Sequence, residues 1–141
     1  MDRNTVFVDT GAWYALADSS DQYHDEAVKI YPKLLGNYHP LKTTNLIAAE
    51  THILIRRCIG YQAAIAFLEN VASSPRVFKI YSDSMLEERA ESILRQYQDQ
   101  DFSYTDAVSF IVMKERGIEQ ALTFDNHFAI LGFQLLPVMS A

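Results

Sequence analysis

Residues 104–116 have the pattern of a helix that is apolar on nearly every side. The run from Ala107 to Met113 is almost entirely apolar, and charged residues close the helix before Gly117. A helix that is apolar all round belongs in the interior of a protein. Asp106 nevertheless lies at its start, on the same face as Phe110. Because an isolated buried charge costs several kcal/mol, Asp106 requires either a hydrogen-bonding partner or a cation.

A capping box offers a structural explanation for the same acid. Ser103 and Asp106 have the spacing in which the first residue caps the helix and the third residue of the helix bonds back to it. On this segment alone, a structural role and a cation-binding role for Asp106 both stay open.

The chain as a whole alternates short apolar strands with helices. Strands are predicted at residues 5–8, 41–44, 77–81, 120–124 and 134–136, and helices at residues 12–17, 22–35, 46–59, 61–72, 85–97, 104–116 and 126–131. We expect Asn45 to cap the helix at 46–59 and Pro32 to kink or break the helix at 22–35. This alternation predicts an α/β fold with a mostly parallel sheet covered by helices on both faces.

Length and composition predict one globular domain, residues 1–141. The chain is 49% hydrophobic and 21% charged, and it contains no apolar run of the length that spans a bilayer. Its first residues lack the pattern of a signal peptide. The single cysteine, Cys58, cannot form an internal disulfide, which predicts a cytoplasmic protein. A net charge of -6 argues against a broad basic surface that coats nucleic acid, but not against a nuclease that holds its substrate through metal ions.

Four acids lie on elements that ought to be buried. Asp9 and Asp125 follow two predicted strands, Asp106 begins the apolar helix, and Glu50 has apolar neighbours along its helical face. The carboxyl ends of parallel strands meet at one edge of a sheet, where ligands bind in folds of this class. Each acid alone has a structural explanation, such as an ion pair between Glu50 and Arg57. Four of them without matching Lys or Arg nearby favour a site for hard divalent cations, Mg²⁺ or Mn²⁺.

Such a site suits hydrolysis of a phosphodiester, because a divalent ion lowers the pKa of bound water and stabilises charge on the reacting oxygens. His127 follows Asp125 closely; it either reaches this site or belongs only to the short last helix. No His/Cys spacing indicates structural zinc, and no glycine-rich phosphate loop is present.

The motifs that carry these acids resemble the PIN-domain family and, within it, the VapC-type toxins of prokaryotic toxin–antitoxin pairs. The resemblance covers almost the whole chain and rests on four segments in the expected order: Val8–Trp13, Asn45–Glu50, Phe102–Ala107 and Leu122–Phe128. It implies a three-layer α/β/α fold, a Mg²⁺- or Mn²⁺-dependent ribonuclease acting on RNA, and a homodimer. It also implies a small antitoxin that places a basic segment in the acidic site.

The resemblance assigns roles to individual residues. It implies that Asp9, Glu50, Asp106 and Asp125 are the catalytic and metal-binding acids. The supporting positions that it implies are Thr10, Thr105 and Thr123, and Asp101 less directly. Two alternatives remain. One is a PIN-like module that binds a metal or partner without turnover. The other is a receiver-like phosphoacceptor domain, which requires a second acid beside the strand-end aspartate and a downstream lysine.

Overall fold

In the computed structural model of the protein, the structure of residues 4–138 is described, and its sheet has five parallel strands. The strand order is β3-β2-β1-β4-β5, and every neighbouring pair is parallel. The strands are β1 (Val6–Val8), β2 (Leu41–Thr44), β3 (Val77–Ile80), β4 (Gln120–Leu122) and β5 (Gln134–Leu136). The all-parallel sheet confirms the predicted fold class. The first and last three residues of the predicted domain lie outside the described part.

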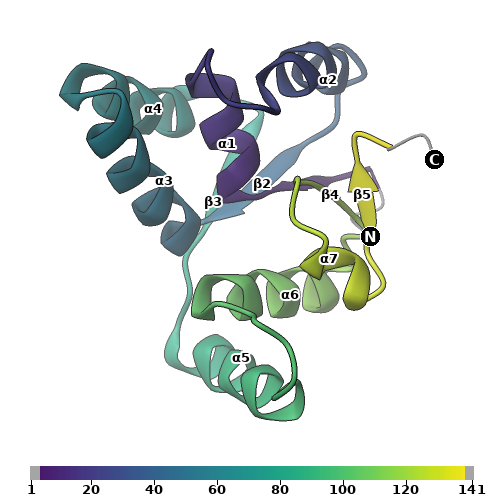
Figure 1. Ribbon diagram of the computed structural model, residues 1–141. Helices are drawn as coiled ribbons and strands as arrows, with labels where there is room; N and C mark the ends of the chain where they lie inside the picture. The colour runs from purple at the N-terminus through teal and green to yellow at the C-terminus, as the bar shows by residue number, and fades with distance from the viewer. Residues whose placement is uncertain (1–3, 139–141) are drawn as a thin grey trace.

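Seven helices cover the sheet within residues 4–138. They are α1 (Thr10–Ala17), α2 (His24–Gly36), α3 (Asn45–Cys58), α4 (Tyr61–Ser73), α5 (Ser84–Gln96), α6 (Tyr104–Arg116) and α7 (His127–Ile130). Helices α1 to α4 lie on one side of the sheet and α5 to α7 on the other (Figure 1), which gives three layers, α/β/α. None of the helices in the described residues is long and apolar enough to cross a membrane.

The change of side occurs between two neighbouring strands, β1 and β4. Strand β1 leads through α1 and α2 to β2, whereas β4 is reached through α5 and α6 from β3 at the far edge. In open parallel sheets, ligands bind at such a point, beyond the carboxyl ends of the strands. The topology therefore places the segments that follow Val8 and Leu122 side by side at the expected site.

Helix α6 forms the centre of its layer, as its apolar sequence predicts. Every residue from Ala107 to Met113 is buried, and Phe110 packs edge-to-face on Phe128 of α7. Full burial of a phenylalanine contributes about 1.5–3 kcal/mol. The helix ends at Gly117, whose φ of 68° is readily adopted only by glycine.

Several predicted details of the helices and strands differ from the structure. Helix α2 continues through Pro32, so the predicted break does not occur. Pro32 and Val28, one turn earlier, are both exposed. The cap of α3 is Thr44, not Asn45, because the Thr44 hydroxyl accepts from the backbone of Ile47. Strand β4 ends at Leu122, two residues earlier than predicted.

Candidate metal-binding active site

The four predicted acids border one pocket of about 450 Å³ at the carboxyl ends of β1 and β4. Asp9 immediately follows β1, and Asp125 lies in the segment between β4 and α7. Asp106 is in the first turn of α6, and Glu50 comes from α3. Residues from both helical layers therefore converge on the edge of the sheet that the topology singles out.

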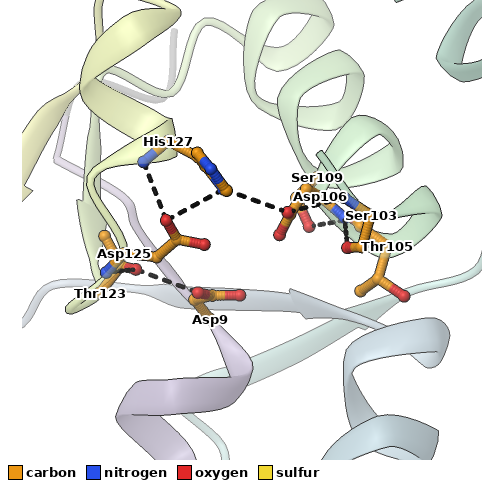
Figure 2. A network of polar contacts seen from close by, with 8 residues as sticks. All are labelled: Asp9, Ser103, Thr105, Asp106, Ser109, Thr123, Asp125 and His127. Carbon is orange, nitrogen blue, oxygen red and sulfur yellow. Dashed lines mark hydrogen bonds and ion pairs between the residues drawn. The ribbon is translucent and has the colours of Figure 1, made fainter. Parts of the chain in front are cut away.

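A single hydroxyl links Asp9 to Asp125. Thr123 Oγ1 donates to Asp9 Oδ2 at 3.0 Å and accepts from the backbone N–H of Asp125 at 3.0 Å (Figure 2). Asp9 is 6% exposed and Thr123 is 2% exposed, so this link is shielded from water. Of the supporting residues that the resemblance implies, Thr123 has the most direct contact with the acids.

Asp106 forms a complete capping box and also faces the other acids. Its Oδ2 accepts from the backbone N–H of Ser103 at 3.0 Å, and its own N–H donates to Ser103 Oγ at 3.0 Å. Its side chain nevertheless borders the pocket with Asp9 and Asp125. The structural explanation for this acid is therefore correct, and it does not exclude a role in the pocket.

His127 lies between two of the acids. Its Nδ1 is 3.1 Å from Asp125 Oδ1 and 3.6 Å from Asp106 Oδ2 (Figure 2). Neither contact has hydrogen-bond geometry, so this buried nitrogen lacks a hydrogen-bond partner among the described residues. The imidazole packs edge-on against Phe102, with ring centroids 5.1 Å apart. The sequence left open whether His127 reaches the acids or belongs only to the short last helix. In the structure its side chain lies beside Asp106 and Asp125.

Burial and mutual repulsion alter the titration of two acids. Burial raises the pKa of Asp9 from 3.8 to about 7; the backbone N–H of Thr10 opposes this rise, while the charges of Asp106 and Asp125 add to it. Burial likewise raises the pKa of Asp106, the N–H of Ser103 opposes it, and the charge of Asp125 adds to it. The folded protein thus holds carboxylates where negative charge is unfavourable without a cation.

The donor groups fit a hard divalent cation. Ligand atoms of Asp106, Asp125 and His127 lie within 4.8 Å of one another. Thr10 also lines the pocket, and its Oγ1 is buried without a hydrogen-bond partner among residues 4–138. No Lys or Arg is among the described residues that line the pocket. Oxygen-rich, uncompensated groups of this kind are the ligands that Mg²⁺ and Mn²⁺ prefer.

Glu50 reaches the pocket for a different reason from the one predicted. Its helical neighbours Ile53 and Leu54 are 37% and 38% exposed, so the expected burial of the apolar face is wrong at these two positions. Ile47, three residues before Glu50, is buried as expected, together with Thr51 and Ile55. Glu50 itself is half-buried in the pocket wall. In the described part of the chain it forms no ion pair with Arg57.

Two other supporting candidates lie outside the pocket. The backbone carbonyl of Thr105 accepts from Ser109 Oγ at 2.8 Å, but Thr105 is not among the described lining residues. Asp101 is exposed in the loop before α6 and is not among them either.

Three aromatic residues, Tyr14, Tyr23 and Phe124, line the pocket without having been predicted, and two of them, Tyr23 and Phe124, stack on each other. Tyr23 lies just before α2 and Phe124 just after β4, and nothing in either local sequence indicates that the two segments meet.

Comparison with known proteins gives consistent matches over most of the chain. The PIN-domain family model matches residues 6–134. The "23S rRNA-specific endonuclease VapC20" of Mycobacterium tuberculosis is 33% identical over 129 residues, which cover 91% of this chain and 95% of that protein. A "VapC ribonuclease" of Archaeoglobus fulgidus is 29% identical over 127 residues, which cover 89% of this chain and 80% of that one.

Solved structures match as well. The crystal structure of M. tuberculosis VapC20, described as a sarcin-ricin loop cleaving toxin, has a TM-score of 0.81 at 33% identity. The match covers 92% of this chain and 96% of that one. VapBC2 of Rickettsia felis, crystallised with a DNA fragment from its promoter, has a TM-score of 0.68. That match covers 93% of this chain and 96% of the R. felis chain. At 12% identity the latter supports the fold alone.

Proposed function

This chain belongs to the PIN-domain family, and on that basis we propose that it is a Mg²⁺- or Mn²⁺-dependent endoribonuclease, the toxin of a toxin–antitoxin pair. The observation that carries the proposal is the convergence of Asp9, Glu50, Asp106 and Asp125 on one pocket. Relatives that match this chain almost end to end are named as ribonucleases. The proposal includes a cytoplasmic location, which the presence of a single cysteine supports, because disulfides are rare in that compartment.

In this proposal, Asp9, Asp106 and Asp125 hold the divalent ion. Ligand atoms of Asp106 and Asp125 lie within 4.8 Å of each other and of His127, and Asp9 and Glu50 line the same pocket. When bound, the ion lowers the pKa of a water molecule and stabilises charge on the phosphodiester oxygens. Thr123 keeps the carboxylate of Asp9 beside the Asp125 segment, and the Ser103 N–H keeps Asp106 oriented. These fixed contacts preorganise the carboxylates before the substrate binds.

The test of this function uses purified protein, labelled single-stranded and structured RNAs, and Mg²⁺, Mn²⁺ or EDTA. We expect internal cleavage with either ion and none in EDTA. On the same samples, Mn²⁺ should raise the melting temperature, since an ion that binds only the folded state stabilises it. Absence of cleavage with every ion would contradict the enzymatic proposal. If Mn²⁺ still raised the melting temperature, the protein would be the binding module that is the alternative.

The receiver-like alternative has no support in the pocket. It requires a lysine beside the acids, and the described lining residues include none. The family match over residues 6–134 is also to PIN domains.

We further propose a small antitoxin as the partner. An arginine can pair with two carboxylates at once, and the pocket presents acids without a lining Lys or Arg in the described chain. A separate cavity of about 550 Å³, lined by Trp13, Tyr31 and Phe67 among others, lies between α1, α2 and α4 and suits apolar side chains of the same partner. The homodimer that the resemblance implies stays a prediction.

Co-expression with the product of a neighbouring small gene tests the partner. We expect a stable complex on affinity purification and relief of the growth arrest caused by the toxin alone. A matched antitoxin variant with its basic residues changed to alanine should inhibit RNA cleavage less. If expression does not slow growth and no such gene exists, the toxin role fails while the ribonuclease role stands on the cleavage assay.

A further inference from the structure

Two aromatic rings form part of the wall of the acidic pocket. Tyr23 and Phe124 lie parallel, with ring centroids 4.4 Å apart and an interplanar angle of 3°. Both side chains are half-buried, and both border the pocket that Asp9, Asp106 and Asp125 line. Because the rings stack face to face, each covers one face of the other, and the parts that stay exposed can contact a molecule that enters the pocket.

Hydrogen bonds next to each ring hold the pair in place. The backbone N–H of Tyr23 donates to Asp21 Oδ2 at 2.9 Å, which fixes the segment before α2. On the other side, the backbone N–H of Asp125 donates to Thr123 Oγ1 at 3.0 Å, across Phe124. Each segment has anchors that do not involve the rings. The aromatic surface is thus preformed, and its position relative to the acids is set by the same Thr123 that bonds Asp9.

The described residues that line the pocket offer a nucleic acid no cationic side chain. The acids repel phosphate groups unless a cation is bound. Aromatic side chains attract nucleobases without using charge, because every base has a flat π-face. A base inside a duplex has both faces covered by its neighbours, whereas an unpaired base can stack on protein.

We propose that Tyr23 and Phe124 are a stacking platform for an unpaired RNA base next to the phosphodiester that lies at the acids. The inference rests on the proposed ribonuclease function and extends it to substrate choice. In this proposal, the two rings select nucleotides that lie in single strands, loops or bulges. The cleavage chemistry stays with the acids.

The experiment compares Tyr23→Leu and Phe124→Leu with the conservative variants Tyr23→Phe and Phe124→Tyr. The probe is a short fluorescein-labelled single-stranded RNA, intact or with abasic nucleotides on both sides of the cleaved bond. We expect each leucine variant to raise KM for the intact RNA roughly tenfold with little change in kcat. The conservative variants should stay close to wild type, because they keep an aromatic ring at each position.

The abasic RNA separates stacking from a structural role. Wild type should lose about as much affinity for abasic RNA as the leucine variants lose for intact RNA, and the leucine variants should show no further loss on abasic RNA. If the leucine variants instead lose the same factor on both RNAs, or lose kcat and melting temperature together, the rings only support the fold and the proposal is overturned.

Binding assays test the stacking proposal separately, even if the proposed ribonuclease function fails. If wild type cleaves no RNA, fluorescence anisotropy in Mn²⁺ with intact RNA and with a fully abasic strand of equal length still measures stacking. Preference of wild type for the intact strand, lost in the leucine variants, would support the platform. Equal binding of both strands by wild type would overturn it.

Discussion

Asp106→Asn is expected to lower the rate of RNA cleavage by roughly a hundredfold or more while the protein stays folded. The change removes one charge at the ion site but little volume. Asparagine still carries an oxygen that can accept from the backbone N–H of Ser103, the bond that Asp106 Oδ2 makes at 3.0 Å. Cleavage in Mn²⁺ and circular dichroism on the same samples measure the two effects.

The opposite partner in the capping box supplies the matched control. Ser103→Ala removes the hydroxyl that accepts from the Asp106 N–H at 3.0 Å, and loss of such a cap costs about 1 kcal/mol. It leaves the Ser103 backbone N–H that orients the Asp106 carboxylate. We therefore expect Ser103→Ala to lower stability and to keep most of the cleavage rate. If Asp106→Asn lost stability but cleaved RNA like wild type, Asp106 would be a capping residue alone.

Much of this architecture is predictable because local and global signals agree. Helix α6 has the predicted bounds, Tyr104 to Arg116, since an apolar run, a capping box and Gly117 all mark the same element. The meeting of Asp9 and Asp125 follows from a general rule, because the strands before them are parallel neighbours in the sheet. The strand pattern predicts that both acids lie at the carboxyl edge of the sheet, and the parallel pairing of β1 with β4 makes them neighbours there.

The contacts that complete the pocket join segments that are far apart in the sequence, so no local sequence pattern predicts them. Thr123 and Asp9 are 114 positions apart in sequence and become hydrogen-bonded only through the β1–β4 pairing. The stacking of Tyr23 on Phe124 likewise joins a helix start to a strand end. Glu50 shows the limit of periodicity, because an apolar helical face at Ile53 and Leu54 turned out to be exposed.

Asp9→Asn is expected to change stability and activity in opposite directions. Asp9 has a pKa of about 7 in the folded protein, against 3.8 as its ordinary value, chiefly because it is buried. Between these pH values the folded state keeps a proton that the unfolded state has lost. The stability of the metal-free protein should therefore fall as pH rises through this window, by at most about 1.4 kcal/mol per pH unit and on the order of 4 kcal/mol in all.

Urea unfolding in EDTA from pH 4 to pH 8 measures this effect as the difference between wild type and Asp9→Asn. The asparagine cannot ionise, so its advantage should be greatest at pH 8, reduced by the cost of burying its amide N–H groups. Asp99→Asn, an exposed acid after α5, removes the same charge outside the pocket and should follow wild type. A difference that does not grow with pH would contradict the assigned burial of a charge at Asp9.

Saturating Mn²⁺ should reverse the order of stability at pH 8. The ion neutralises the repulsion that Asp9 feels from Asp106 and Asp125, so wild type gains stability that the asparagine variant lacks. RNA cleavage should fall by roughly a hundredfold or more in the same variant, because a carboxylate that holds the ion is lost. An acid kept only for stability would show the opposite pattern, since replacing it would weaken the fold. A residue that lowers the stability of the metal-free protein but is needed for the ion should therefore show both effects when it is replaced, and we expect Asp9 to do so.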